Sequence, residues 1–335
     1  MLQCVLLVAW FLLLWRFPGC SFSAAKQGPL RLLREKAGLE LRTKVNNPNM
    51  TYSDEARVLL GQIADARERG DWHKVRCIFR SYSGKELPVF HAVLHAAYNC
   101  GQFREAAVIY DELHSLKITL DAAAFATGIK IFAKLEDPVR VREIWANATR
   151  SCALDELLAA ARIDAAAAEG DIRTAAEVLD LMNRTGVQIN IAHITSAIRA
   201  CWEAPGSGHN AAEYLFNLLL ERGLQPNVVM FTSLMGAYSS APLSQVLAAR
   251  AKMRMLQVQA NKAFVEVYLN TLLQITKEEW KDLRSVQEMS TRLAHRSPER
   301  LAAARAALAD FRREHVTMTT LSDKIERAMK MVGTD

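Results

Sequence analysis

Residues 221–235 read Glu221-Arg222-Gly223-Leu224-Gln225-Pro226-Asn227-Val228-Val229-Met230-Phe231-Thr232-Ser233-Leu234-Met235. Glycine and proline mark a turn that ends at Asn227, and a largely apolar stretch follows directly. Looser copies of the segment that precedes this stretch end at Asp121 and Asn190. The spacing of these segments predicts an internal repeat with a period near 35 residues.

Glycines give a second marker with a similar spacing. Gly70, Gly101 and Gly170 each end a predicted first helix, and each is followed by a polar residue and then a second, apolar helix. The two markers divide the chain into six repeats, at 53–86, 87–121, 122–155, 156–190, 191–227 and 228–261. The fifth repeat has 37 residues, and its excess lies in a Gly-, Pro- and Ser-containing loop at 204–208.

Each repeat is expected to contain two amphipathic helices joined by a tight turn. Alanine and leucine dominate the chain, and both residues favour helix. Because neither helix can cover its apolar stripe alone, neighbouring pairs must stack and share a continuous core. The sequence therefore predicts an all-α protein, an α-solenoid of helix-turn-helix repeats. Ser53 is expected to cap the first helix, with Asp54 and Glu55 in its first turn.

The last part of the chain, 262–335, is predicted to hold a degenerate repeat and C-terminal capping helices. Helices are expected at 277–295, 298–315 and 320–332, the second of them beginning with Pro298 after Ser297. This part is rich in Arg and Lys. We expect it to shield the apolar face of the last repeat.

Composition and motifs argue against an enzyme. The formal net charge of +6 permits an anionic partner without demonstrating one. The six cysteines include no C-x-x-C pair and are expected to be small buried hydrophobes. His91 and His95 lie four residues apart, but the glutamate of a zinc protease and a third ligand are missing. Phosphate-binding glycine loops, nucleophile elbows and paired-carboxylate signatures are also missing, so we expect no metal, no cofactor and no catalysis.

The first 52 residues indicate targeting. Residues 2–15 form an apolar run that is short for a membrane span, and small residues that resemble a signal-peptidase site follow at 21–25. Residues 26–52 are basic and poor in acids. We interpret 1–25 as a hydrophobic targeting signal and 26–52 as a presequence, which together resemble the bipartite leaders of complex plastids. Mitochondrial import, simple secretion and a signal anchor remain open, and no membrane association is expected of the mature form.

The junction at 221–235 resembles that of the pentatricopeptide repeat family. There, glycine, an apolar residue and Pro-Asp or Pro-Asn close one repeat, and a V-V-x-aromatic-Asn/Thr-x-Leu segment opens the next. Residues 182–198 are a looser copy. The resemblance covers about residues 53–261, and it implies a right-handed superhelix that binds single-stranded RNA with one base per repeat. Tetratricopeptide repeats, which mostly bind proteins, have nearly the same period and are the alternative if the period alone is considered.

The resemblance places base recognition at the fifth and last residues of a repeat. Carried over to this chain, these residues are Thr195 with Asn227 and Thr232 with Asn261, and the family reads such a pair as adenine. Hydroxyl and amide groups can both donate and accept hydrogen bonds. Ala192 and Val229, at the second place, would be apolar wedges between bases. A threonine at the start of a helix can also be a local cap.

Other repeats depart from this pattern. The fifth place holds His91, Ala126 and Ala160, paired with Asp121, Asp155 and Asn190. An alanine cannot bond a base edge, whereas His91 with Asp121 can contact a base that the resemblance does not identify. One or two turns further along the same helices lie Lys130, Lys134 and Arg199, which are expected to neutralise phosphates or to be solvated.

Two functions are consistent with these features. The first is sequence-selective binding of single-stranded organellar RNA in support of RNA processing, stability or translation, with other RNA-processing proteins as partners. A plastid is the preferred location and a mitochondrion the alternative. The second function is a protein-protein interaction scaffold, which the alanines at fifth places favour. A nuclease has no support in the sequence.

Overall fold

The computed structural model describes residues 53–206, 208–276, 279 and 285–332. The predicted targeting signal and presequence lie outside the described residues. Sixteen helices and no strand occur in the described ranges, which confirms the all-α prediction. Within these ranges, no helix has the length and the apolar character needed to cross a bilayer.

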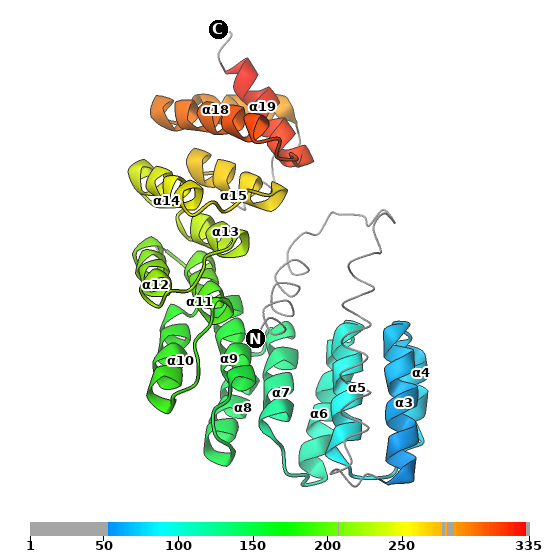
Figure 1. Cartoon of the computed structure of the whole chain (residues 1–335). Helices are drawn as coiled ribbons and strands as arrows, with labels where there is room; N and C mark the ends of the chain where they lie inside the picture. Colours follow the sequence, from blue (N-terminus) through cyan, green and yellow to red (C-terminus); the bar gives the residue numbers. More distant parts are fainter. Residues whose placement is uncertain (1–52, 207, 277–278, 280–284, 333–335) are drawn as a thin grey trace. The chain divides into compact units, whose positions relative to one another are not determined.

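The chain divides into two compact units with a boundary inside helix α9 (Glu156–Glu169). Of the described residues, 53–165 belong to the N-terminal unit and 166–332 to the C-terminal unit. Each of the six ranges assigned from the sequence to a repeat contains two helices. The helices of both units are labelled in Figure 1.

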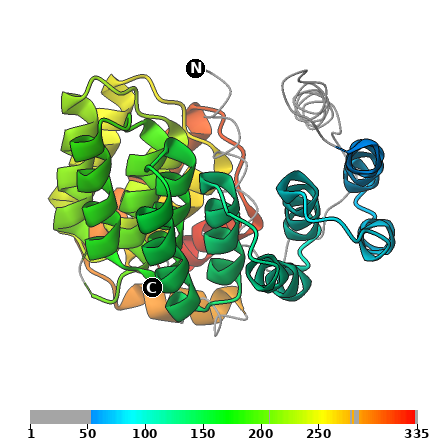
Figure 2. The ribbon, with the colours of Figure 1, turned by 90° about the horizontal axis from the view of Figure 1, so that it is seen from below.

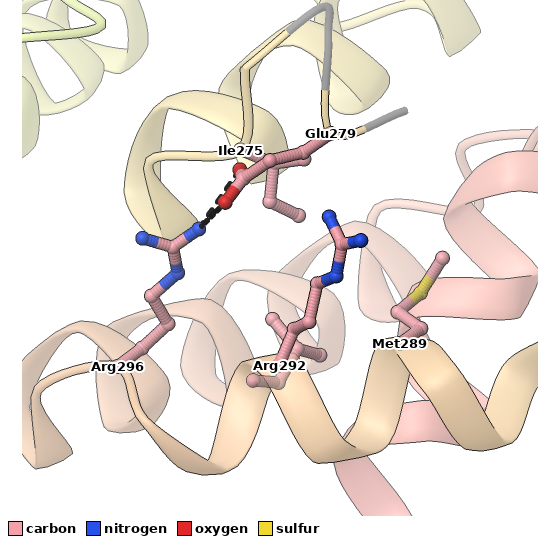
Figure 3. Close-up of a pocket in the computed structure, with 6 residues that line it drawn as sticks. Ile275, Glu279, Met289, Arg292 and Arg296 are labelled. Carbon is pink, nitrogen blue, oxygen red and sulfur yellow. Dashed lines mark hydrogen bonds and ion pairs between the residues drawn. The ribbon is translucent and has the colours of Figure 1, made fainter. Parts of the chain in front are cut away.

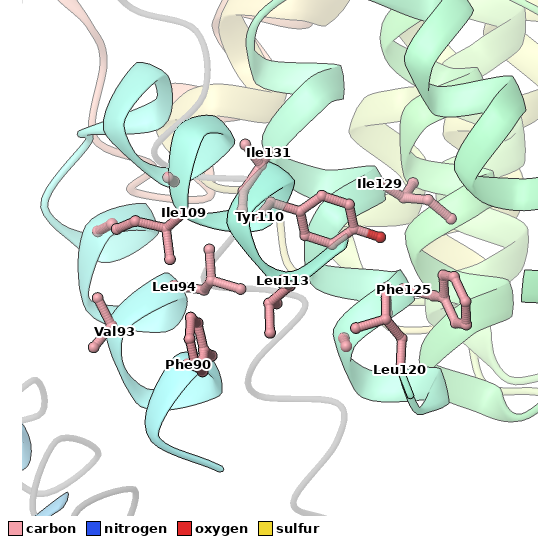
Figure 4. Close-up of a cluster of buried hydrophobic side chains, with 14 of the residues drawn as sticks. Phe90, Val93, Leu94, Ile109, Tyr110, Leu113, Leu120, Phe125, Ile129 and Ile131 are labelled. Atoms are coloured by element: carbon pink, nitrogen blue, oxygen red, sulfur yellow. The ribbon is translucent and has the colours of Figure 1, made fainter. Parts of the chain in front are cut away.

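The N-terminal unit is a row of antiparallel helical hairpins, which Figure 2 shows nearly end on in blue and cyan. Its hairpins pair α3 with α4, α5 with α6 and α7 with α8. The helices are α3 (Asp54–Glu68), α4 (Trp72–Arg80), α5 (Leu87–Asn99), α6 (Phe103–Ser115), α7 (Ala122–Lys134), α8 (Pro138–Ser151) and the first part of α9. Apolar side chains from successive hairpins form one continuous core, part of which is drawn in Figure 4.

The C-terminal unit continues the pattern and ends in additional helices. The last turn of α9 is followed by α10 (Ile172–Thr185), α11 (Ile191–Glu203), α12 (His209–Glu221), α13 (Val228–Ala237), α14 (Leu243–Met255) and α15 (Lys262–Leu273). Three further helices complete it, α17 (Val286–Ala294), α18 (Pro298–Arg313) and α19 (Thr320–Met331).

Short polar side chains (Asp, Asn, Ser and Thr) cap most of the helices in the described ranges. Ser53 caps α3 by accepting a hydrogen bond from the Ala56 backbone N–H at 3.1 Å, as predicted. Such a bond satisfies a backbone donor that the helix itself leaves unpaired. The side chains that cap helices in this way include Asp71, Asp121, Asp137, Asp171, Asn190, Asn227, Asn261, Ser285, Ser297 and Thr319.

Glycine ends the first helices where the sequence predicts. Gly70, Gly101 and Gly170 have φ angles of 70°, 73° and 67°, a left-handed conformation that L side chains rarely adopt. Each lies in the short turn between the two helices of a hairpin. The left-handed residue reverses the chain, which allows the second helix to pack against the first.

Two buried arginines attach α18 to the preceding repeat. Arg300 donates hydrogen bonds to the backbone oxygens of Thr271, Leu272 and Ala241 at 2.9–3.1 Å. Because the last carbonyls of a helix have no intrahelical donor, this guanidinium completes the C-terminus of α15. Arg250 on α14 binds both carboxylate oxygens of Glu314, at 2.9 and 2.8 Å. The predicted C-terminal cap is therefore held by specific polar contacts.

A small pocket lies beside α17, lined by Ile275, Glu279, Met289, Arg292, Leu293 and Arg296 (Figure 3). Arg296 binds both carboxylate oxygens of Glu279, at 2.6 and 2.8 Å. The pocket contains none of the residues singled out from the sequence. We interpret it as part of the packing interface between the last repeat and the C-terminal cap.

Two sequence predictions need correction. A single helix was expected from 277 to 295, but Ser285 has an extended backbone and caps α17, which begins at Val286, so one continuous helix does not span this range. All the cysteines were expected to be buried, yet of the four that lie in the described ranges only Cys201 is buried, whereas Cys77 is exposed and Cys100 and Cys152 are half-buried. Three of these four side chains therefore lie at the edge of the core.

Close packing of α7 on α6 depends on Gly128. A Cβ atom at this position would lie 2.4 Å from the ring of Tyr110, which is fully buried and projects from α6 towards α7 (Figure 4). Gly128→Ala should therefore lower the free energy of unfolding by about 1–3 kcal/mol. Gly61 in α3 is the matched control because nothing lies within 4 Å of its Cβ position.

Gly61→Ala should raise the free energy of unfolding by about 0.5–1 kcal/mol, because alanine loses less backbone entropy in a helix. Urea unfolding followed by circular dichroism measures both variants. Equal effects of the two substitutions would contradict the packing described for Gly128.

Candidate functional site

Within each unit, first helices of successive repeats lie side by side. In the N-terminal unit α3 contacts α5 and α5 contacts α7, and in the C-terminal unit α11 contacts α13 and α13 contacts α15. We call each of these rows a first-helix face. Residues at one place in the repeat recur along such a face. All ten residues predicted to bind RNA lie on these helices or cap them.

The last residues of the repeats are helix caps. Oδ1 of Asn227 accepts the Met230 backbone N–H at 2.9 Å, and Oδ1 of Asn261 accepts the Phe264 backbone N–H at 2.9 Å. Since a backbone N–H can only donate, each contact fixes which end of the amide faces the helix. Neither amide nitrogen donates a hydrogen bond within the described part of the chain. Each asparagine thus presents N–H donors from a fixed position.

Thr232 adds an acceptor to the same face. Its side chain is half-buried, and its hydroxyl donates to the backbone oxygen of Val228 at 2.7 Å. Because the hydroxyl proton is used in this bond, the oxygen is left to accept. Thr232 and Asn261 therefore offer one acceptor and one donor from adjacent first helices. The Watson–Crick edge of adenine has the complementary groups, an N6–H donor and an N1 acceptor.

Thr195 does not match the expectation of an accessible hydroxyl. Its exposed fraction is 2%, and its helix α11 packs directly against α13. This burial contradicts the predicted accessibility of Thr195. A base contact at Thr195 stays a prediction, and it would require these two helices to separate.

The remaining predicted residues of the C-terminal unit are partly accessible. Ala192 and Val229, the predicted wedges, are both half-buried on the first-helix face. Arg199 is also half-buried and interacts with other groups of the protein. Contacts of these three side chains with bases or phosphates stay predictions.

The predicted pair His91 and Asp121 is brought together in the N-terminal unit. Nε2 of His91 lies 3.2 Å from Oδ1 of Asp121, and the same carboxylate caps α7 through the Ala124 backbone N–H at 2.8 Å. Desolvation lowers the pKa of His91, while the carboxylate raises it in part. The fifth and last residues of a repeat are thus neighbours here, as the resemblance implied.

Basic side chains next to this pair were only partly recognised from the sequence. Lys130 was predicted, and desolvation lowers its pKa while the charge of Asp164 raises it in part. Arg67 and Asn99 were missed, although Nδ1 of His95 lies 3.3 Å from Arg67 Nη1 and 3.2 Å from Asn99 Nδ2. The four-residue spacing from His91 to His95 to Asn99 was the available signal.

Metal binding finds no support at these histidines. Within the described ranges, no three His, Cys, Asp or Glu side chains are grouped in a way that would hold a metal ion. The neighbours of His95 are instead an arginine, a lysine and an amide.

Residues 163–240 match the family described as the pentatricopeptide repeat domain. The matched residues include Thr195, Asn227 and Thr232, together with the predicted wedges Ala192 and Val229. No curated protein matches the sequence.

Solved structures with the same fold include the pentatricopeptide repeat protein PPR10 from maize. It has a TM-score of 0.56 and 15% identity, over 87% of this chain and 37% of that chain. Two crystal structures of PPR10 in complex with an 18-nt psaJ RNA element, one of them with cysteines replaced by serine, each have a TM-score of 0.61 and 14% identity. They cover 93% of this chain and 41% of theirs, so the chain spans about two fifths of the proteins that it matches.

The cap contacts give a stability prediction for the repeats. Asn227→Ala should lower the free energy of unfolding by about 1 kcal/mol, because the Met230 N–H loses its acceptor. Asn227→Asp keeps a carboxylate oxygen in the same place and should be nearly neutral. Urea unfolding of the two variants tests this, and an alanine variant as stable as wild type would show that the cap contributes nothing.

Proposed function

We propose that the chain binds single-stranded RNA along its first-helix faces. The observation that carries this proposal is the match of residues 163–240 to the pentatricopeptide repeat domain. In that stretch Asn190 and Asn227 cap successive first helices, at the places where the resemblance puts base-reading residues. PPR10, whose structures share the fold, is in complex with RNA in two of them, which supports the proposal.

We further propose that Thr232 and Asn261 read one adenine. The threonine oxygen accepts from the adenine N6–H, and the asparagine amide donates to N1. The cap bond to Phe264 orients the amide before RNA arrives, so that little side-chain entropy is lost on binding. The pair Thr195 and Asn227 would read the neighbouring adenine only if α11 and α13 separate.

Replacement of Asn261 by aspartate tests the readout without removing the cap. Asn261→Asp keeps an oxygen for the Phe264 N–H but exchanges the outward donor for an acceptor. Binding is measured with a uridine oligonucleotide that contains two adjacent adenines and with the same oligonucleotide in which guanines replace them. The ratio of adenine affinity to guanine affinity should be about tenfold or more lower for Asn261→Asp than for wild type. The variant should bind the guanine oligonucleotide more tightly because the N1–H of guanine donates to the new carboxylate.

The control for this experiment is Asn147→Asp, which adds the same charge on the second helix α8. It should weaken the binding of both oligonucleotides equally and leave the ratio of the two affinities unchanged. Thr232→Val should lower adenine preference as well, since it removes the acceptor oxygen. Equal preference of wild type for adenine and guanine would reject base reading, and affinity that ignored salt would reject phosphate contact too.

A protein-binding scaffold is the second candidate. The burial of Ala126 and Thr195, with exposed fractions of 1% and 2%, favours it, because these fifth places offer no polar group to a base. A scaffold would show no measurable RNA affinity in the experiment above. We assign the chain no catalytic step, and any RNA processing would be carried out by a partner.

We propose that this RNA is organellar and that binding supports its processing, stability or translation. The support is the character of residues 1–52, an apolar segment followed by a basic, acid-poor one. A fluorescent protein fused to residues 1–52 should enter a plastid, with a mitochondrion as the alternative. A cytosolic signal would overturn the presequence interpretation and leave RNA binding untouched.

A further inference from the structure

Four side chains from three adjacent first helices of the N-terminal unit face one another. Arg67 comes from α3, His95 and Asn99 from α5, and Lys130 from α7. Nδ1 of His95 lies 3.3 Å from Nη1 of Arg67 and 3.2 Å from Nδ2 of Asn99, and Lys130 acts on the charge of His95. We call these residues the His95 cluster.

The hydrogen bonds define the protonation of His95. A guanidinium and an amide NH₂ can only donate, so both contacts require Nδ1 to accept. The imidazole is therefore neutral, and its proton is on Nε2. Protonation of Nδ1 would break both contacts, and it would free the N–H donors of Arg67 and Asn99 for another acceptor.

Positive charge dominates around the imidazole. Desolvation, and then the charges of Arg67, Lys130 and His91, lower the pKa of His95 to about 4. The nearby acids act on groups other than His95. Glu68 raises the pKa of Arg67, Asp164 raises the pKa of Lys130, and Asp121 raises the pKa of the neighbouring His91. His95 and Asn99 are nevertheless exposed to solvent. The cluster thus places two half-buried cations, Arg67 and Lys130, beside an accessible imidazole, an arrangement that an anion would stabilise.

We propose that the His95 cluster binds one phosphate group of the RNA backbone. Guanidinium, ammonium, imidazolium and amide N–H groups are the donors that bind phosphate oxygens in charge-assisted hydrogen bonds. The assignment of the phosphate to RNA rests on the proposed function. The site carries no base information. This is consistent with Ala126, which offers no polar group at the fifth place of the repeat that contributes Lys130.

Binding at this site takes up a proton. The phosphate favours the charged imidazole and raises the pKa of His95 in the complex above its value in the free protein. The complex then binds more protons than the free protein at any pH between the two pKa values. Affinity therefore increases as pH falls through the pKa of the complex, and it levels off below about 4.

The experiment measures binding of a uridine oligonucleotide to the full chain at about pH 7.5 and about pH 5. Neither uracil nor the phosphodiester titrates in this range, so any proton uptake belongs to the protein. If RNA raises the pKa of His95 by about two units, affinity at about pH 5 should be about tenfold higher than at about pH 7.5. The imidazole resonances of His95 should report the same rise directly by NMR.

His95→Gln should abolish most of this pH dependence, while the matched control His73→Gln, on the second helix α4, should retain it. Lys130→Met should weaken binding at both pH values and make the salt dependence shallower by about 0.7 per contact. Circular dichroism at both pH values verifies the fold of each variant.

The outcomes separate this site from the proposed function. Tight binding that does not change with pH, or that changes equally in His95→Gln, would overturn the phosphate site and leave RNA binding intact. No binding of any oligonucleotide by wild type at either pH would overturn RNA binding, and the assignment of the phosphate to RNA with it.

Discussion

No helix of this chain can cover its apolar side alone, and this constraint decides the rest of the structure. Second helices pack against first helices, and first helices pack against the first helices of the next repeat. The approach is close where side chains are smallest, as at Gly128 against Tyr110 and at Gly236 against Trp202. Because the repeats within a unit share a core, only part of each first helix reaches the surface, and every candidate functional residue except Thr195 is at least partly exposed there.

Local features were predictable from the sequence, and contacts between repeats were not. A cap such as Asn227, or a left-handed turn residue such as Gly70, depends on bonds within a few residues of chain. The burial of Thr195 depends on how closely α13 approaches α11, which no local pattern encodes. The contact of Arg67 with His95 likewise joins helices separated by all of α4. The repeat and its caps could therefore be predicted, whereas the accessibility of individual residues could not.

Because the last residues of the repeats are helix caps, a polar residue at this place is not by itself evidence of RNA recognition. Asp121, Asn190, Asn227 and Asn261 each start a first helix, so selection for helix formation alone would place an acid or an amide there. Function is indicated instead by the half of the side chain that the cap leaves unused. An asparagine keeps N–H donors, while an aspartate keeps an acceptor, and this difference can discriminate between bases without any change in fold.

Affinity and specificity need not come from the same repeats. In the N-terminal unit the fifth place of the third repeat is a buried alanine, yet its first helix carries Lys130 beside His95. In the C-terminal unit Thr232 and Asn261 present an acceptor and a donor. Phosphate contacts give salt-dependent affinity for any sequence, whereas base edges give discrimination. A chain with few complete base-reading pairs therefore needs cationic positions such as the His95 cluster to hold RNA firmly enough for one pair to select it.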